Sequence, residues 1–599
     1  MAAENNEREG FASLIDNIKY FVKNFENFFR TPYMPRIMVL AVFVGIVGGL
    51  GAVVFYNLIL LFKYIFYGAA DTAVFLDHVR ALPWYYRLIA PALGGLIVGP
   101  MVTYIVPEAK GHGVPEVMEA LVLKAGEIRF IVAPLKALIS AICIGSGGSA
   151  GREGPIVQIG ASFGSSLGEY FELPPDKVKT LLGAGAAAGI AGTFNAPLAG
   201  VVFSMEVLLR KFEMEDFSPL VVAAVIGTAV ANILFGEADP VFQIPEHELV
   251  NYFELILYMG LGIAGGMVAL IYGNFLYKME HIFEKFPVPT ASKAAIGGLC
   301  LGALALLLPQ VQATGYPVME DALHGRLPVY TAFLLMFAKI LATWFTLGSG
   351  GSGGIFAPAL FIGAMLGNGY GHIVGALFPT LTAGAGSYAM VGLGTVFAGA
   401  THAPLTAIII LFEMTHDPLI ILPMMFACKF SSLFTRWWQR RNIYTTKLVL
   451  RGIDLDTIEG RDVLSEIPAE EVMSTDLVTV YENTTVDEAR HIFQNTLYNF
   501  LPVTSEDQRD LCGLLGYNYT MEYFAEGGDM SAEVRELAYY SPPKVTEKET
   551  LLRALKLIDE YGITLIPVVS EEDEDKLVGI LSRSDILEAY HHWEIKIDK

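Results

Sequence analysis

Long apolar segments dominate the chain between residues 37 and 435, and Gly or Pro interrupts many of them. The stretch from Ile340 to Phe412 holds 73 residues without one Asp, Glu, Lys or Arg. That is too long for a core helix, and a loop in water would not need it. Short or broken helices are tolerated at membrane depth only where they face protein or a polar cavity, as in transporter binding sites. The pattern therefore predicts an all-α, multi-span membrane domain with broken helices. The apolar segments lie roughly at 37–62, 88–107, 130–144, 155–170, 178–210, 217–236, 254–277, 294–308, 328–347, 355–379, 386–412 and 417–435.

Residues 11–30 place apolar side chains at helical spacing, which predicts an amphipathic helix. Two interpretations are open: a helix lying at the membrane surface, or an ordinary docked helix. We assign residues 1–32 to this N-terminal cytoplasmic segment. Its first residues, MAAENNEREG, lack a basic region followed by an apolar one, so no cleaved signal peptide is expected.

The membrane part contains an internal repeat. Gly145–Ala161 and Gly348–Ala364 share ten of 17 residues at an offset of 203. A second pair supports the repeat, because an Ala-Pro-Leu sequence follows both Asn195 and His402, and a glutamate lies eleven residues after each, at an offset of 207. Two copies of one membrane unit place a binding site at their interface, near the midplane.

Charge separates this apolar body from an acidic tail. Residues 452–599 hold 32 acidic and 12 basic residues, a net charge of −20, whereas residues 1–451 carry 30 and 28, a net charge of −2. The sign of the tail excludes nucleic acid as a partner. The basic cluster Arg436, Arg440, Arg441 and Lys447 follows the last long segment, so the positive-inside rule places this end and the tail in the cytoplasm. The four cysteines form no CxxC pair, which argues against a zinc site or a disulfide framework.

Three glycine-rich turns, each followed by Pro and an apolar helix, carry the candidate chemistry. They are Gly111–Glu116, Gly151–Pro155 and Gly354–Pro358. A free helix N-terminus offers N–H donors and a pole of roughly +0.5 charge, which is worth about 2 kcal/mol to an anion about 4 Å away at an effective dielectric constant of about 20. Several such poles aimed at one point would bind an anion reversibly, whereas a full Lys or Arg charge would hold it too tightly for fast release.

These three turns resemble the signature motifs of the CLC family of chloride channels and chloride/proton exchangers, over about residues 33–450. The tail resembles a tandem pair of CBS domains, because Leu501-Pro502-Val503 and Ile566-Pro567-Val568 mark two similar α/β units. The resemblance implies inverted repeats, a homodimer in the lipid bilayer, and one chloride pathway per subunit. It divides the chain into a transmembrane domain (33–450), a linker (451–468) and two CBS domains (469–525 and 534–599).

The resemblance also implies roles for individual residues. Glu153, in the GREGP motif, is the expected gate, whose carboxylate mimics an anion; the alternative is a first-turn acid that only compensates the helix dipole. Tyr444 is expected to donate its hydroxyl to the central anion; the alternative is an interfacial aromatic anchor. The predicted anion-binding set is His112, Gly113, Arg152, Gly154, Ile355, Phe356 and Tyr444.

Two positions depart from the family pattern. His112 stands where a serine is usual, so either its imidazole is a pH-sensitive ligand or it points away and backbone atoms bind the ion. Val207 stands at the position of the inner glutamate of proton-coupled members, and Glu206 beside it would face elsewhere on a helix. We therefore predict a channel-like or weakly proton-coupled protein, with a chloride/proton antiporter of the same family as the alternative.

In the tail, Ser582 and Asp585 match the pattern by which CBS domains hold the phosphate and ribose of an adenosine nucleotide, so ATP, ADP or AMP is a candidate ligand. The first CBS unit has Tyr519 at the position of Asp585. No cofactor is otherwise expected to be required.

Other classes of protein fit less well. Ser149 and Ser352 each lie in a GxSxG match, but a nucleophile elbow needs a preceding strand and a His partner, and both matches follow apolar helical segments. A match to the dinucleotide fingerprint at Gly348 has no βαβ unit around it. An intramembrane zinc protease would need HExxH, which His247-Glu248 does not complete. A cation carrier would need carboxylates within the membrane, where the charge-free stretch offers none. We therefore expect no enzyme and no metal site.

Overall fold

The computed structural model describes residues 33–69, 75–236, 242, 250–455, 464, 467–496, 498–505, 510–525, 527–529, 531–573, 575–586 and 589. The helix predicted over residues 11–30, part of the linker and the last residues of the second CBS domain lie outside this set. The chain forms two compact units, Met1–Ile453 and Asp454–Lys599, which we describe separately.

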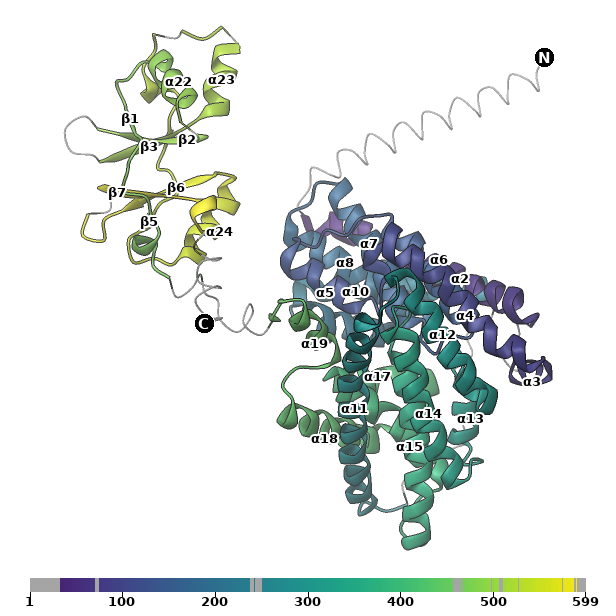
Figure 1. The fold of residues 1–599 in the computed structure, drawn as a ribbon. Coiled ribbons are helices and arrows are strands. Elements are labelled where there is room, and N and C mark those ends of the chain that lie inside the picture. Colours follow the sequence, from purple (N-terminus) through teal and green to yellow (C-terminus); the bar gives the residue numbers. More distant parts are fainter. Residues whose placement is uncertain are drawn as a thin grey trace, which may run out of the picture. The chain divides into compact units, whose positions relative to one another are not determined.

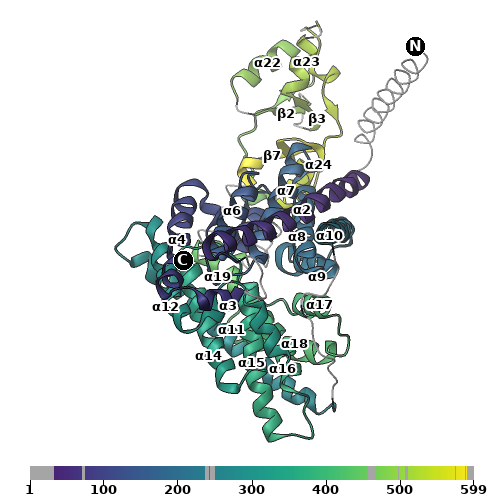
Figure 2. The same ribbon diagram turned by 90° about the vertical axis from the view of Figure 1, so that its right-hand side faces the viewer.

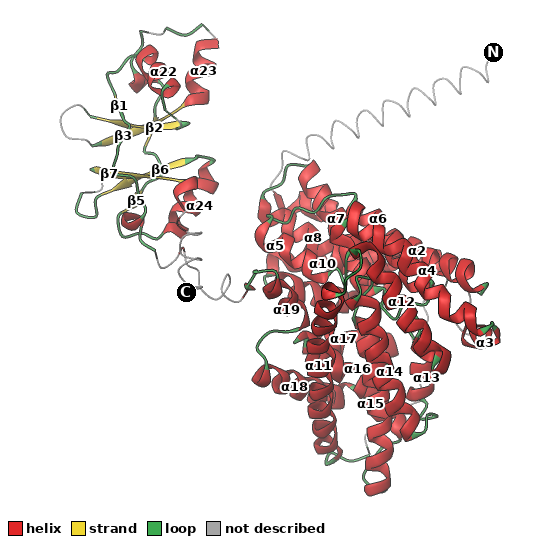
Figure 3. Ribbon diagram, viewed as in Figure 1, coloured by secondary structure: helices red, strands yellow, loops and turns green. Residues whose placement is uncertain are grey.

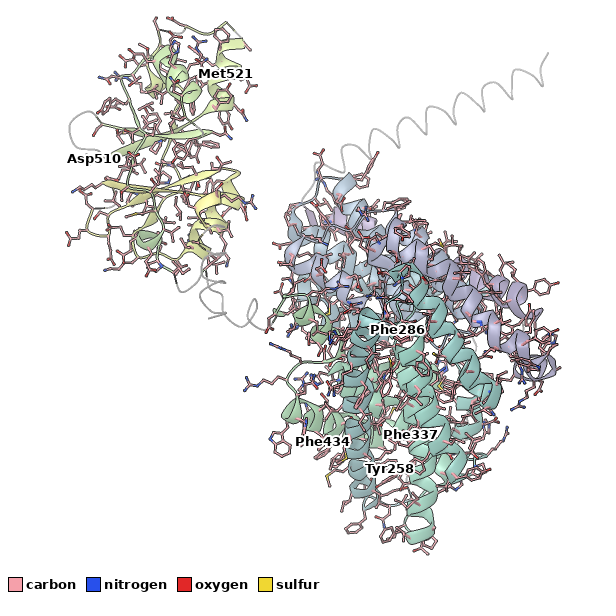
Figure 4. The ribbon with its side chains drawn as sticks, viewed as in Figure 1. Tyr258, Phe286, Phe337, Phe434, Asp510 and Met521 are labelled. Carbon is pink, nitrogen blue, oxygen red and sulfur yellow. The ribbon has the colours of Figure 1, made fainter. Side chains whose placement is uncertain are left out.

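The described part of the first unit is built from helices (Figure 3). Seven of its described helices are long and apolar enough to cross a membrane. Its outside carries large apolar side chains, such as Phe337, which is 55% exposed, and Phe286, which is 49% exposed (Figure 4). A water-soluble protein would hide most of these side chains, whereas hydrocarbon is a good solvent for them. The multi-span helical prediction is confirmed.

The helices follow the two copies of the repeat, which gather on opposite sides of the unit (Figures 1 and 2). The first copy contains α2 (Tyr33–Tyr67), α3 (Phe75–Ala81), α4 (Trp84–Pro100), α5 (Val114–Leu123), α6 (Val132–Gly145), α7 (Glu153–Tyr170), α8 (Pro175–Phe194), α9 (Pro197–Phe203) and α10 (Met214–Phe235). The second contains α11 (Glu254–Lys285), α12 (Thr290–Leu307), α13 (Tyr316–Leu323), α14 (Val329–Gly348), α15 (Phe356–Leu377), α16 (Ala385–Thr401), α17 (Pro404–Thr415), α18 (Ile421–Trp438) and α19 (Ile443–Leu450). Short irregular helices join them at Met101–Ile105, Pro107–Ala109, Ser204–Leu209 and Pro309–Val311.

Breaks in the helices occur at matching places in the two copies. Asn195 directly follows helix α8 and His402 directly follows helix α16, and both residues adopt left-handed backbone angles, with φ of 54° and 57°. A proline then opens α9 and α17, where its missing N–H is not needed. The single apolar segment expected over 178–210 is therefore divided into α8, α9 and the irregular helix Ser204–Leu209.

The paired glutamates brace these breaks reciprocally. Glu206 of the first copy accepts hydrogen bonds from the backbone N–H groups of Leu405 (3.2 Å) and Thr406 (2.7 Å) at the start of α17. Glu413 of the second copy accepts them from Leu198 (3.0 Å) and Ala199 (2.7 Å) at the start of α9. Each copy thus supplies the anionic cap for a helix of the other, which satisfies otherwise unpaired N–H groups.

Two fully buried lysines hold the turns that precede α5 and α13. Lys136 donates to the carbonyl oxygens of Ala109 and Gly111, both at 3.0 Å. Lys339, exactly one repeat offset later at 203 residues, donates to those of Val311 (3.0 Å) and Ala313 (2.7 Å). A buried ammonium must have such partners, so each lysine clamps one turn.

The second unit contains two small sheets. In the first, β1 (Val480–Tyr481) pairs in parallel with β2 (Phe500–Thr504). Strand β2 pairs antiparallel with β3 (Leu511–Gly516), and β3 pairs antiparallel with β4 (Tyr539–Tyr540). In the second, β5 (Val545–Thr546) pairs in parallel with β6 (Leu565–Val569), which pairs antiparallel with β7 (Leu577–Ser582). Each half has its own apolar core. The helices α22 (Val486–Gln494), α23 (Tyr517–Ala525) and α24 (Leu551–Tyr561) complete this α/β unit.

Candidate anion pathway

The three glycine-rich turns lie together and are hydrogen-bonded to one another. Gly111 donates to the carbonyl of Gly351 at 3.0 Å and accepts from Gly353 at 3.2 Å. Gly151 and Gly354 exchange two hydrogen bonds of 2.8 and 2.6 Å. Turns more than two hundred residues apart in the sequence therefore form one small backbone core.

Glycine is required where these turns approach most closely. A Cβ atom on Gly154 would lie 1.9 Å from the carbonyl oxygen of His112. Gly113 precedes α5 with a φ of +87°, and a Cβ there would lie 2.8 Å from the carbonyl oxygen of Gly154. Any side chain at either position would push the turns apart.

Glu153 is the first residue of α7, and only 3% of it is exposed. Its Oε2 accepts a hydrogen bond from the backbone N–H of Ala357 (3.4 Å), in the first turn of α15, and its Oε1 accepts one from the Tyr316 hydroxyl (3.3 Å). The carboxylate therefore occupies the N-terminus of another helix, which is a place that favours an anion.

A small cavity of about 10 Å³, enough for the centre of one water-sized sphere, lies beside this carboxylate. Four helices that line it, α5, α7, α15 and α19, do so with residues of their first turns or just before them. The structure thus brings together widely separated candidate residues at converging helix N-termini. Its lining residues are His112, Val114, Glu153, Gly154, Val157, Ile190, Phe194, Phe203, Ile355, Phe356, Ile410 and Tyr444.

Tyr444 and His112 form one wall of the cavity. Tyr444 is 2% exposed and is the second residue of α19, whose start is fixed by a capping box at Asn442. The rings of His112 and Tyr444 lie 5.7 Å apart, and Nε2 of His112 is 3.2 Å from the hydroxyl of Tyr277. The imidazole therefore lines the cavity with one nitrogen already engaged, and its role as a ligand stays a prediction.

The other candidate residues lie apart from the cavity. Arg152 donates to the carbonyl of Thr193 (3.1 Å), and its guanidinium lies 5.4 to 5.6 Å from three aromatic rings, those of Tyr56, Phe194 and Tyr316. Val207 is buried in the irregular helix after α9 and is not among the lining residues. The predicted anion contact of Arg152 stays a prediction.

Sequence reasoning missed Tyr316, which donates to Glu153. A signal was present: Gly113-Val114-Pro115 aligns with Gly315-Tyr316-Pro317 across the repeat, so α13 had to enter the site as α5 does. The buried lysines were also missed, although each is an isolated charge in an apolar segment at the repeat offset of 203.

In the second unit, the nucleotide candidates contact each other. Oδ2 of Asp585 accepts from the backbone N–H of Ser582 (2.8 Å) and from its hydroxyl (2.7 Å). Ser582 and Asp585 therefore form a local cap. Oδ1 of Asp585 accepts no hydrogen bond from the described residues. Nucleotide binding there stays a prediction.

Two family models and several known proteins match the chain. A family model described as "Voltage gated chloride channel" matches residues 94–436, and the CBS domain model matches residues 469–523 and 534–592. The chain is 35% identical over 395 residues to "Putative chloride channel protein ClcB-like" of Ralstonia nicotianae, covering 65% of this chain and 91% of that protein. It is 32% identical over 433 residues to "H(+)/Cl(-) exchange transporter ClcA" of Salmonella agona, covering 70% and 89%.

Solved structures show the same fold. A slow cyanobacterial Cl⁻/H⁺ antiporter matches with a TM-score of 0.63 and 25% identity, over 72% of this chain and all of that one. A eukaryotic CLC transporter matches with a TM-score of 0.67 and 21% identity, over 92% of this chain and 98% of that one.

Proposed function

Because the chain belongs to the CLC family of voltage-gated chloride channels and transporters, we propose that chloride crosses the membrane through the cavity beside Glu153 and that Glu153 is its gate. One observation carries the proposal: the Glu153 carboxylate lies at the N-terminus of α15, beside a cavity lined by Tyr444 and His112. A chloride ion passing this point must take the place of the carboxylate.

The gate works through competition for the same N–H donors. An ionised Glu153 is held by the pole of α15 and by the Tyr316 hydroxyl. A protonated Glu153 loses most of its attraction to that pole and yields the place to chloride. The Tyr444 hydroxyl and the backbone N–H groups of Ile355 and Phe356 then replace part of the lost hydration.

Different residues favour different modes of transport, channel-like conduction or exchange of chloride for protons. Val207 favours channel-like or weakly coupled conduction, because it removes a carboxylate that would carry protons. The Salmonella relative is named an H(+)/Cl(-) exchange transporter, and His112 adds a titratable group to the cavity; both favour exchange. We also propose a homodimer with cytoplasmic termini, on the family resemblance and the basic residues that follow α18.

Substitution of Glu153 tests the gate. In liposomes with an outward chloride gradient, we expect the purified protein to release chloride faster at about pH 5.5 than at about pH 8, because protonation frees the site. Glu153→Gln should remove this dependence and give fast release at both pH values. An electrode that senses chloride measures the rate.

The control is Glu172→Gln, which removes an exposed carboxylate just after α7 and should leave the pH dependence intact. If the Glu153 variant kept the pH dependence of the unmodified protein, the gate assignment would be wrong. If the unmodified protein released no chloride at all, the transport proposal itself would fail.

A further inference from the structure

The hydrogen bonds around His112 define which nitrogen carries its proton. Tyr277 donates its single hydroxyl proton to the carbonyl oxygen of Ile443. The hydroxyl can therefore only accept from Nε2 of His112, at 3.2 Å, so Nε2 bears the hydrogen. The other nitrogen, Nδ1, is a buried acceptor with no hydrogen-bond partner among the described residues. A buried lone pair left unpaired in this way can accept a proton, or it can accept a hydrogen bond from a water molecule.

An acidic cleft of about 510 Å³ is lined in part by residues that come shortly before and after His112 in the sequence. Glu108, Glu116, Glu119, Glu127 and Glu169 line it, together with Gln158 and the cations Lys124, Arg129 and Arg451. Arg451 directly follows α19, the last helix of the first unit.

The cleft contains orphaned acceptors of its own. Oε2 of Glu116 and Oε1 of Gln158 have no hydrogen-bond partner in the described part of the chain, although both residues are at least nine-tenths buried. Oxygen atoms that only accept hydrogen bonds require a partner that can donate one, and water or a hydrated proton meets that need.

Charged groups from several helices act on His112. The carboxylate of Glu116 (α5) favours a second proton on the ring, whereas Lys136 (α6) and Lys447 and Arg451 (α19) oppose it. Tyr277 (α11) and Tyr444 (α19) contact the ring as neutral groups. Burial of the ring, and after it these three cations, oppose a second proton on the imidazole, and a chloride ion in the adjacent cavity would offset part of that opposition.

Among the described residues that line the cavity, His112 is the one basic side chain. Apart from it, the titratable lining residues are Glu153 and Tyr444. Glu206, beside the apolar Val207, has both carboxylate oxygens engaged in capping α17. Among the titratable residues that line the anion cavity, His112 interacts electrostatically with Glu116, which lines the cleft.

We propose that His112 carries protons between the acidic cleft and the Glu153 gate, so that chloride moves in exchange for protons; this rests on the proposed function. A hydrated proton in the cleft passes through water held by the free oxygen of Glu116 to Nδ1 of His112, which leaves a water molecule and an imidazolium. Nδ1 then gives the same proton to the Glu153 carboxylate, which becomes a neutral acid while His112 returns to its neutral form. Since uptake and release use one nitrogen, the bond to Tyr277 is kept.

The ratio of protons to chloride ions tests this proposal. Liposomes with an outward chloride gradient are monitored at once by a chloride electrode and a pH electrode, with the full chain reconstituted. With the unmodified protein, we expect protons to enter the liposomes as chloride leaves them. His112→Gln keeps a donor for Tyr277 but cannot carry a proton, so its proton-to-chloride ratio should fall at least about tenfold. Glu116→Gln should lower the ratio less, because water can still reach Nδ1.

A matched control is His324→Gln, since His324 lies in a different cleft and bonds to the carbonyl of Glu320 at 2.9 Å. Its ratio should equal that of the unmodified protein. An unchanged ratio in His112→Gln would overturn the proposal. Chloride release by the unmodified protein without any proton uptake would also overturn it, yet would leave the proposed anion pathway standing.

Discussion

The Tyr444 side chain is the neutral donor that the proposed pathway offers to an anion. It is buried and it lines the cavity. A hydroxyl in such surroundings costs free energy until it donates to something. Chloride satisfies it without the strong hold of a full positive charge, which suits an ion that must leave again.

Tyr444→Phe therefore should weaken chloride binding. Loss of one neutral donor corresponds to about 1 kcal/mol, or roughly fivefold in the dissociation constant. Titration calorimetry with chloride in detergent measures it. Tyr370→Phe is the control, because that hydroxyl donates to the carbonyl of Leu257, away from the cavity. Equal affinities in the Tyr444 variant and the unmodified protein would show that the hydroxyl is not a ligand.

At the scale of elements, the two buried lysines determine where the helices α5 and α13 begin. Each ammonium gathers two carbonyl oxygens of a turn that would otherwise be unpaired inside the protein. In the first copy this turn ends at Gly111, directly before His112. The position of the imidazole therefore depends on a lysine of another helix, α6.

Lys136→Met and Lys339→Met should each destabilise the membrane domain by about 2 kcal/mol, since two buried carbonyls lose their donor. Thermal unfolding in detergent, followed by intrinsic fluorescence, reports the loss as a lower midpoint. Lys285→Met is the control, because Lys285 is exposed at the end of α11. If either lysine variant unfolded at the same temperature as the control, its clamp would contribute nothing to stability.

The reciprocal caps provide a test of the repeat itself. Glu206→Ala leaves N–H groups at the start of α17 unpaired, and Glu413→Ala does the same at α9. We expect each to lower the free energy of unfolding by about 1 kcal/mol, the usual value of such a cap. Similar losses, measured by unfolding in detergent, are expected because the two bracing arrangements match. A loss in only one variant would contradict their equivalence.

The sequence predicted those parts of the fold that depend on local chemistry. The turns at Gly113 and Gly154 could be predicted because no other residue fits them, and Glu153 because its motif is specific. The contact from Tyr316 to Glu153 could not, because it depends on how α13 packs against α7. The capping by Glu206 could not be predicted either. The sequence repeat paired Glu206 with Glu413, but only the packing of the two copies shows that each glutamate caps a helix of the other copy.

At the scale of the whole molecule, the chain separates two kinds of chemistry. Every residue that lines the anion cavity belongs to the unit that ends at Ile453, whereas most of the negative charge belongs to the unit that follows. The second unit has its own apolar cores and sheets (Figure 4, where Asp510 and Met521 mark it). It can therefore be studied alone.

Within that unit, the prediction that Ser582 and Asp585 hold a nucleotide can be tested. Both hydrogen bonds from Ser582 end on Oδ2, which leaves the lone pairs of Oδ1 available for the hydroxyls of a ribose. The first half of the unit has Tyr519 instead, which offers no carboxylate.

We expect ATP to release heat when titrated into residues 452–599, and Asp585→Ala to abolish that heat while circular dichroism shows the fold retained. Tyr519→Ala, changed at the equivalent place of the other half, should bind as the unmodified unit does. Equal heats from the Asp585 and Tyr519 variants would mean that the nucleotide is not held by Asp585, and no heat from the unmodified unit would leave Ser582 and Asp585 as a helix cap alone.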